Sequence, residues 1–197
     1  MFRLVVGITG ASGVIYGIRF LEVVKEFGIE TYAVVSPAAY ETIVMETDYR
    51  KDDVERLATK VFGFRDIAAP ISSGSFKTDG MVVIPCSMKT LAGIANGYED
   101  NLLIRSAMVT LKERRKLVLV IRETPLNRIH IRNMLLADAA GAIILPASPG
   151  FYHKPKTIQD LVDHIVGKVL DIFTIEHSLY ERWRGPTAVA DQVKINT

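Results

Sequence analysis

The stretch LVVGITGASGVIYG, Leu4 to Gly17, joins a short apolar run to a helix-like pattern through a glycine-rich loop. Residues 4–8 fit a buried strand, and the glycines with Ser12 fit a tight turn into a helix over Val14 to Phe27. This order of elements is typical of proteins that hold a nucleotide at the end of a parallel strand. The loop alone leaves three interpretations open: a dinucleotide site, a mononucleotide site, or a turn that binds nothing.

The same alternation continues along the chain. Four more Val/Ile/Leu runs each precede helical patterns; the runs cover residues 31–35, 81–85, 117–121 and 142–146, and the helical patterns 38–47, 87–95, 102–113, 128–140 and 158–173. Runs of this kind, buried on both faces and separated by helices, predict an α/β fold. We expect a Rossmann-like or flavodoxin-like open parallel sheet with helices on both faces, in three αβα layers. One domain over residues 1–185 and a C-terminal tail over residues 186–197 are expected.

Composition narrows the class of protein. The 197 residues are 49% hydrophobic, which is high for one small domain and predicts a homo-oligomer. A net charge of +2 argues against nucleic acid as a partner. The single cysteine, Cys86, excludes an internal disulfide and favours the cytoplasm. No apolar run approaches the roughly 20 residues of a membrane span, and we expect no leader segment.

Polar residues gather where the predicted strands end. They are Thr9, Ser12, Gly13, Ser36, Cys86, Ser87, Lys89, Thr90, Arg122, Glu123, Ser148, Phe151 and Tyr152. Parallel strands place their carboxyl ends at one edge of a sheet, which is where such folds bind ligands. The sequence therefore predicts a single site at this edge.

A dinucleotide site is the weaker interpretation of the loop. Gly7, Gly10 and Gly13 match the G-x-x-G-x-x-G spacing of short-chain NAD(P) oxidoreductases, but the next strand ends in Ser36 without a carboxylate or arginine for the ribose. Tyr152 and Lys156 have the Tyr-x-x-x-Lys spacing, but Pro155 between them is incompatible with a regular helix interior. A mononucleotide fits better.

Several motifs together resemble one family. GITGASG, SPAA, SSGSF, PCSMKTLAGIA, LKERRKLVLVIRETPL, NML and GAIILPASPGFYHKP follow one another between about Leu4 and Trp183. They resemble the UbiX-type flavin prenyltransferases, a branch of the flavin-binding cysteine-decarboxylase-like fold. The resemblance implies transfer of a dimethylallyl group from dimethylallyl phosphate to reduced FMN. It also implies a cytoplasmic homododecamer that supplies prenylated FMN to UbiD-type decarboxylases. The monophosphate or pyrophosphate donor, and ubiquinone biosynthesis or aromatic decarboxylation as the pathway, stay open.

The resemblance also implies the site residues. FMN binding is expected at Gly10, Ala11, Ser12, Ser36, Ser87, Met88, Lys89, Thr90 and Arg122. The donor is expected at Lys112, Tyr152, Lys168 and Trp183, partly from neighbouring subunits, and the catalytic positions at Ser12, Glu46 and Glu123. From the residues alone, Lys112 and Lys168 also fit ordinary solvated charges.

One further class of enzyme shares this fold. An FMN-dependent cysteine decarboxylase of the same fold relies on a histidine just after the first helix, but this chain has no histidine before His130. The four histidines show no metal-ligand spacing, so no metal is expected. Cys86, at the end of a buried strand, fits a small hydrophobe better than a nucleophile.

Overall fold

The computed structural model describes residues 2–183 and 185 of the 197-residue chain. The chain divides into two compact units, Met1–Ser148 and Pro149–Thr197, and each is described by itself. The tail expected over residues 186–197 lies outside the described residues. No helix among the described residues is long and apolar enough to cross a membrane.

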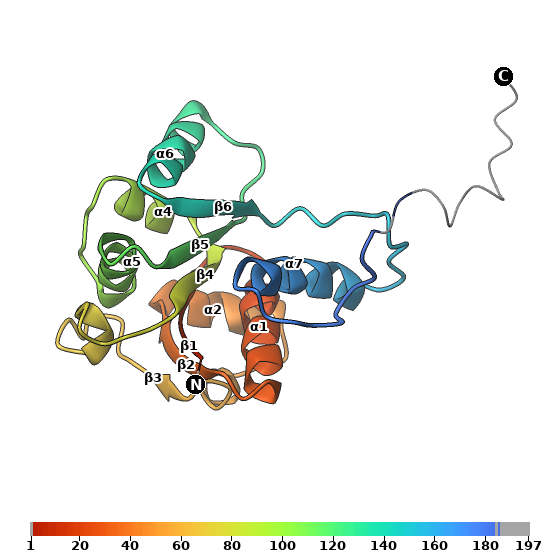
Figure 1. The fold of residues 1–197 in the computed structure, drawn as a ribbon, viewed down its shortest axis with the longest axis horizontal. Helices are drawn as coiled ribbons and strands as arrows, with labels where there is room; N and C mark the ends of the chain where they lie inside the picture. The colour runs from red at the N-terminus through yellow and green to blue at the C-terminus, as the bar shows by residue number, and fades with distance from the viewer. Residues whose placement is uncertain (1, 184, 186–197) are drawn as a thin grey trace, which may run out of the picture. The chain divides into compact units, whose positions relative to one another are not determined.

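The first unit is built on a parallel sheet of six strands (Figure 1). Its order is β3-β2-β1-β4-β5-β6, with the strands at Arg3–Ile8 (β1), Glu30–Val35 (β2), Lys60–Val61 (β3), Gly80–Cys86 (β4), Lys116–Ile121 (β5) and Ala142–Pro146 (β6). The five predicted strands are all present. The sixth, β3, is a two-residue edge strand that pairs with Tyr32 and Ala33 of β2; a segment this short carries no apolar pattern.

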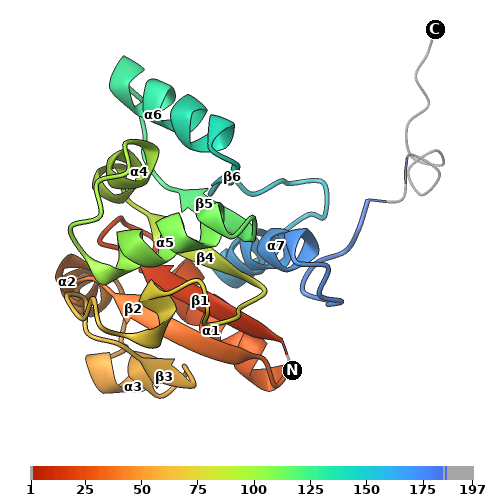
Figure 2. The same cartoon turned by 60° about the vertical axis from the view of Figure 1, so that its left-hand side comes forward.

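Helices cover both faces of this sheet, which confirms the three-layer prediction (Figure 2). They are α1 (Val14–Glu26), α2 (Pro37–Glu46), α3 (Lys51–Glu55), α4 (Met88–Ala95), α5 (Leu102–Lys112) and α6 (Arg128–Ala139), with a 3₁₀ turn, η1, at Pro70–Ser72. Leu91 of α4 and Leu103 of α5 share a buried cluster with Val83 of β4. Since neighbouring strand residues face opposite ways, Ile84 lies on the other face, where α1 packs.

Gly17 allows α1 to lie directly on the sheet. A Cβ atom at this position would stand 2.3 Å from the backbone oxygen of Ile84 and 3.1 Å from the side chain of Ile8. A backbone oxygen within a strand cannot move aside, so we expect Gly17→Ala to lower the free energy of unfolding by about 2–3 kcal/mol. Urea unfolding measures this change.

Gly63→Ala is the matched control, because its Cβ atom would make only an ordinary contact, 3.6 Å from the Cβ atom of Asp66. An unfolding midpoint that Gly17→Ala leaves unchanged would contradict the close packing of α1 on β4.

The strand order reverses beside β1. The chain runs outward from β1 to β2 and β3, then returns to β4 on the other side of β1. In open parallel sheets, ligands bind at the carboxyl ends of the strands that flank such a reversal. The loops after β1 and β4 are therefore the expected floor of a site.

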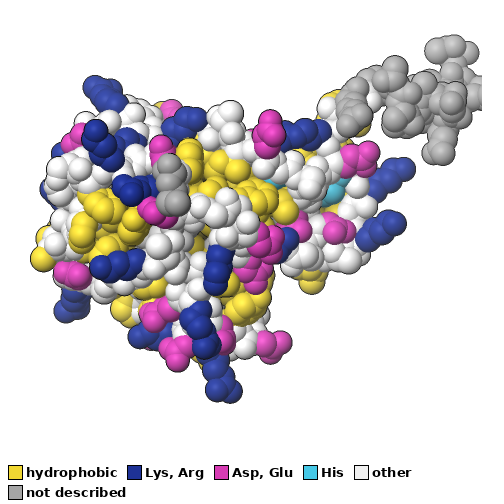
Figure 3. All heavy atoms as spheres, turned by 60° about the horizontal axis from the view of Figure 1, so that its bottom comes forward, with side chains coloured by type: hydrophobic (Ala, Val, Ile, Leu, Met, Phe, Trp, Pro, Cys, Tyr) yellow, Lys and Arg dark blue, Asp and Glu magenta, His cyan; other side chains and the backbone are white. Residues whose placement is uncertain are grey.

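Large apolar side chains remain exposed in the first unit. Val44 and Met45 of α2 are 69% and 82% exposed, and Ile129 and Leu135 of α6 are each 67% exposed. Figure 3 shows a face on which hydrophobic side chains lie among charged ones. Exposed apolar surface of this kind is typical of subunit interfaces, in agreement with the expected homo-oligomer.

The described residues of the second unit contain one helix, α7 (Ile158–Ile172), and irregular segments before and after it. Thr157 caps this helix by accepting a hydrogen bond from the backbone N–H of Asp160, whose carboxylate accepts one from the N–H of Thr157 in return. Residues 149–156 before the helix are not helical. Tyr152 and Lys156 therefore do not share a helix, as the dinucleotide interpretation would require.

Candidate functional site

Thr9 joins the loops that follow β1 and β4. Its side chain is buried, and its hydroxyl donates a hydrogen bond to the carbonyl of Pro85 (2.7 Å) and accepts one from the N–H of Ser87 (2.8 Å). Both hydrogen bonds are made to backbone groups of the protein, so the role of Thr9 is structural. It holds the start of α4 beside the glycine loop, and with it the predicted residues from Ser87 to Thr90.

The loop glycines have structural reasons of their own. A Cβ atom on Gly10 would lie 2.6 Å from the Cβ atom of Ala38, so this glycine lets the loop pack against the start of α2. Gly13 has a φ of 95°, a left-handed conformation that favours glycine, at the residue before α1. The glycine pattern therefore describes how the loop is built, and its ligand has to be inferred from the surrounding side chains.

Glu46 is brought to this loop from the end of α2. Its Oε2 accepts a hydrogen bond from the backbone N–H of Gly13 at 2.7 Å. The start of α1 has no side-chain cap, so the carboxylate of Glu46 sits where a helix N-terminus favours negative charge. Ser12, which is exposed, is the neighbouring residue in the chain. Two of the three predicted catalytic residues therefore lie together.

Serine side chains cap α2 and α4, the helices that begin after β2 and β4 at this edge. Ser36 Oγ accepts from the N–H of Ala39 (3.1 Å), and Ser87 Oγ accepts from the N–H of Thr90 (3.4 Å). Ser87 also donates to the hydroxyl of Thr90 at 3.2 Å. These helix starts offer backbone N–H groups and positive dipole ends to an anionic ligand.

The remaining predicted FMN residues have different surroundings. Ala11 is buried, and its backbone N–H donates to the carbonyl of Thr9 at 2.9 Å. Met88 packs its side chain against the hydrophobic core, so its backbone is the part it can offer to a ligand. Lys89 is exposed.

Arg122 directly follows β5 and reaches the glycine loop. Its Cγ lies 3.9 Å from the place where a Cβ atom of Gly13 would stand. Its Nε is buried and has no hydrogen-bond partner among the residues that the structure describes. Burial raises the pKa of the nearby Tyr16 hydroxyl, and the charge of Arg122 opposes that rise. Burying a guanidinium nitrogen without a hydrogen-bond partner is energetically unfavourable. Nε of Arg122 is therefore available to donate a hydrogen bond to an oxygen or nitrogen atom of a ligand.

Glu123 is the third predicted catalytic residue. It is exposed beside Arg122, and its Oε1 accepts a hydrogen bond from the N–H of Thr124 at 3.1 Å. This single backbone contact orients the carboxylate without neutralising it. Glu123 can therefore accept a proton from a ligand at this edge.

Cys86 takes no part in this chemistry. The side chain is fully buried at the end of β4, and burial raises the pKa of its thiol far above the ordinary value. A thiol that stays protonated is a poor nucleophile. Cys86 behaves as the small hydrophobe expected from the sequence.

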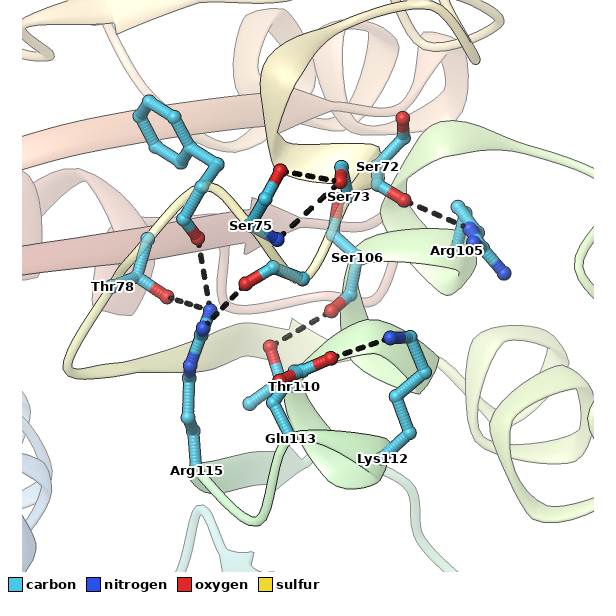
Figure 4. A network of polar contacts seen from close by, with 12 residues as sticks. Ser72, Ser73, Ser75, Thr78, Arg105, Ser106, Thr110, Lys112, Glu113 and Arg115 are labelled. Carbon is cyan, nitrogen blue, oxygen red and sulfur yellow. Dashed lines mark hydrogen bonds and ion pairs between the residues drawn. The ribbon is translucent and has the colours of Figure 1, made fainter.

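Lys112 lies at the opposite edge of the same sheet. It ends α5, just before β5 begins at Lys116, whereas Arg122 follows the other end of β5. Six residues of strand separate these edges by about 17 Å. There Nζ of Lys112 pairs with Glu113 at 2.5 Å, in a network that also ties Arg115 to the carbonyl of Gly74 (Figure 4). One subunit does not bring Lys112 to the residues around Arg122.

The second unit brings two other predicted donor residues into contact. The rings of Tyr152 and Trp183 meet edge to face, with centroids 5.9 Å apart. The hydroxyl of Tyr152 lies 3.4 Å from Nε2 of His164 on α7. Lys168, one turn further along α7, is half exposed and lies 3.7 Å from a carboxylate oxygen of Asp171. Tyr152, Lys168 and Trp183 therefore belong to one small polar and aromatic cluster.

Comparison with known proteins identifies the family. The chain matches the Flavoprotein family over residues 1–170. It is 55% identical over 183 residues to a probable UbiX-like flavin prenyltransferase of Bacillus subtilis, a match that covers 93% of this chain and 90% of the relative. This chain belongs to the UbiX-type flavin prenyltransferases.

Solved structures of UbiX-type proteins share the whole fold. A crystal structure of AnUbiX in complex with FMN and dimethylallyl pyrophosphate has a TM-score of 0.92 and 52% identity, and the match covers 93% of this chain and 98% of that one. A dodecameric FMN-dependent UbiX-like protein from Escherichia coli O157:H7 has a TM-score of 0.92 and 51% identity, covering 93% and 100% of the two chains.

The residues at the carboxyl edge fit the FMN of the UbiX-type family. The fit rests on the unpartnered buried Nε of Arg122 and on the helix starts capped by Ser36 and Ser87. Phosphate and ring oxygens of a flavin are acceptors for such donors. Among residues 2–183 and 185, no group of three or more His, Cys, Asp or Glu side chains is arranged to hold a metal ion.

Two polar residues in the second unit of this UbiX-type chain, His164 and Asp171, were not predicted from the sequence. Both lie on α7 and contact or approach predicted donor residues. One signal was available: Asp171 follows Lys168 by three residues, a spacing that places opposite charges on one helix face. No sequence pattern indicated a role for His164, because its contact with Tyr152 depends on how the irregular segment before α7 folds.

Proposed function

We propose that this chain transfers the dimethylallyl group of dimethylallyl phosphate to reduced FMN and releases prenylated FMN. The observation that carries the proposal is the Arg122–Glu123 pair, which combines an unpartnered guanidinium nitrogen beside the glycine loop with an exposed carboxylate on the next residue. A flavin site needs the first group, and a proton-transfer step needs the second. The AnUbiX complex with FMN and dimethylallyl pyrophosphate supports the same pair of ligands.

We assign the FMN half of the site to the carboxyl edge of the sheet. Its residues are Gly10, Ala11, Ser12, Ser36, Ser87, Met88, Lys89, Thr90 and Arg122. Backbone N–H groups at the starts of α1, α2 and α4 bind the acceptor atoms of the flavin and its phosphate. Reduced FMN, when bound, supplies the electron-rich ring atoms that take up the allyl group.

We assign the donor half to Lys112, Tyr152, Lys168 and Trp183. Cleavage of the allylic C–O bond builds negative charge on the leaving phosphate, which the two lysines and the Tyr152 hydroxyl stabilise. The aromatic faces of Tyr152 and Trp183 stabilise positive charge on the allyl group.

We assign the proton transfers of the reaction to residues near the glycine loop. Closing the new ring joins a flavin carbon to the double bond of the transferred group: the double bond gains a proton, from the released phosphate or from water, and the flavin carbon loses one. We assign acceptance of the lost proton to the exposed carboxylate of Glu123. Ser12 and Glu46, joined through Gly13, form a second polar pair at the glycine loop.

One experiment tests the reaction. The purified protein is incubated without oxygen with FMN, a reductant and dimethylallyl phosphate, and the flavin mass is then measured. We expect a gain of one five-carbon unit. A parallel reaction with the pyrophosphate decides which donor is used. Unchanged flavin mass with both donors would refute the proposed function, and NADH-dependent turnover of an alcohol would favour the oxidoreductase interpretation.

The proposal includes four further properties of the protein. The chain assembles as a homododecamer, as the Escherichia coli O157:H7 relative does, and residues 1–185 act as one flavin-binding domain. Its product serves a UbiD-type decarboxylase as cofactor, in ubiquinone biosynthesis or aromatic decarboxylation. It acts in the cytoplasm.

A further inference from the structure

The segment after α7 contacts that helix through hydrogen bonds to one carboxylate, that of Asp171. The two oxygens of Asp171 accept hydrogen bonds from the hydroxyl of Tyr180 (2.5 Å) and from a guanidinium nitrogen of Arg182 (2.6 Å). His177 Nε2 lies 3.1 Å from the same carboxylate. Three side chains within six residues therefore converge on Asp171, and Trp183 is the next residue in the chain.

Gly167 lets this segment lie against the helix backbone. A Cβ atom at this position would stand 2.6 Å from Cε1 of His177 and 2.6 Å from Cε1 of Tyr180. The two rings thus occupy the space that a side chain of α7 would fill. Asp171, one turn further along, binds the polar ends of the same two side chains.

The ring of Tyr180 also contacts the ring of His164, which lies next to the proposed donor residue Tyr152. Its centroid lies 4.8 Å from that of His164, and His164 stacks on His153 at 4.9 Å with an angle of 5° between the rings. His164 also lies 3.4 Å from the Tyr152 hydroxyl. From Asp171, a continuous series of contacts therefore runs through Tyr180 and His164 to Tyr152.

Asp171 also faces Lys168 directly. The ammonium of Lys168 lies 3.7 Å from Oδ2 of Asp171, on the same helix face. A half-exposed lysine side chain has many rotamers, and an ion pair at this distance restricts them. The carboxylate thus contacts one proposed donor residue and holds the segment that carries another.

We propose that Asp171 is a positioning residue for the prenyl donor: it orients the ammonium of Lys168 and holds Trp183 against Tyr152. The inference rests on the proposed function for its readout in turnover, but the arrangement of Trp183 can be tested without turnover. Asp171 does not touch the donor. It acts through Lys168, Tyr180 and Arg182.

Ionisation of Asp171 agrees with this role. Burial of its carboxylate opposes the charged form, but the hydrogen bonds from Arg182, Tyr180 and His177 outweigh it and lower the pKa of Asp171 to about 2. The carboxylate is therefore charged throughout the working range of pH. Its negative charge is part of the folded arrangement.

The test uses Asp171→Asn, which keeps the size of the side chain and removes its charge. We expect KM for dimethylallyl phosphate to rise about tenfold, with kcat at saturating donor within about threefold of the parent protein. FMN affinity stays unchanged, because the FMN residues lie in the first unit. Trp183 is the only tryptophan of the chain, so its fluorescence anisotropy reports the held segment directly; we expect it to fall.

Asp163→Asn is the matched control, since it removes the same charge from the same helix, where its carboxylate accepts a hydrogen bond from Gln159. It is expected to leave KM and anisotropy unchanged. Asp171→Glu, which keeps the charge, is expected to restore most of both values. If Asp171→Asn does not fold, Tyr180→Phe removes one of the hydrogen bonds and carries the same expectations.

Two results would overturn the inference. A lower KM in Asp171→Asn would mean that the carboxylate only competes with the donor phosphate for Lys168. An unchanged anisotropy would mean that it does not hold Trp183. If the parent protein itself shows no turnover, the proposed function fails, while the anisotropy still decides the role of Asp171.

Discussion

Glu123→Gln is expected to lower turnover by about 10²–10⁴-fold while the protein still binds FMN and stays yellow. Glutamine has the shape of glutamate and can still accept the hydrogen bond from the N–H of Thr124. It cannot take a proton. Anaerobic assays of flavin mass measure the loss of turnover, and flavin absorbance of the purified variant measures binding.

Glu26→Gln provides the control for this variant. Glu26 is an exposed carboxylate at the end of α1, away from the carboxyl edge of the sheet, and its loss is expected to change neither value. If Glu123→Gln instead loses FMN, the carboxylate helps to hold the flavin. If turnover is unaffected, another base, such as the departing phosphate, takes the proton.

The strands could be predicted because each carries its own apolar run. β1, β2, β4 and β5 are largely buried runs rich in Val, Ile and Leu, and β6 is an edge run of similar composition that is mostly half-buried. The helices between them repeat apolar residues on one face. β3 and α3 could not be predicted in this way. β3 is two residues long and exists through pairing with β2, and α3 is a five-residue helix whose Asp53 carboxylate accepts a hydrogen bond from the backbone N–H of Arg50.

The grouping of polar residues at the carboxyl edge of the sheet could be predicted from topology. In a parallel sheet, polar residues at the strand ends meet at one edge, so Ser12, Ser36, Ser87 and Arg122 could be grouped before any coordinates. The loop glycines were harder to interpret, since Gly10 and Gly17 reflect packing against Ala38 and Ile84. A close approach between two backbones leaves no pattern in the sequence around it.

The proposed donor residues were inferred only from family resemblance. Tyr152 and Trp183 are far apart in the chain, and their contact depends on how an irregular segment folds back on α7. Asp171 is one acidic residue among several on an amphipathic helix. Its three partners beyond the helix, His177, Tyr180 and Arg182, follow no periodic pattern that would have singled it out.

The position of Lys112 leads to the second large expected effect. Lys112 and Arg122 stand at opposite ends of β5, about 17 Å apart along the strand. If both act on one donor phosphate and one flavin, they come from different subunits. Lys112→Ala and Glu123→Gln should then each be inactive alone, and should regain activity when the two variant chains are assembled together.

The expected recovery of turnover follows from the fraction of sites that receive both Lys112 and Glu123 intact. A complete site needs Glu123 from a Lys112→Ala chain and Lys112 from a Glu123→Gln chain. With equal amounts and random assembly, about one quarter of the sites are complete. Chains carrying two different tags are co-expressed and purified through both tags in succession, and the flavin mass assay then gives the recovered turnover.

Arg122→Ala mixed with Glu123→Gln is the control for this assembly. These two positions are consecutive in the chain, so every site receives both from the same subunit, and no mixture contains an intact pair. We expect no recovery there. Recovery near one quarter for the Lys112 mixture, and none for the Arg122 mixture, would place Lys112 on the neighbouring subunit. Absence of recovery in both would contradict the placement of Lys112 on the neighbouring subunit, and full activity of Lys112→Ala alone would place Lys112 outside the site, as an ordinary partner of Glu113 at the end of α5.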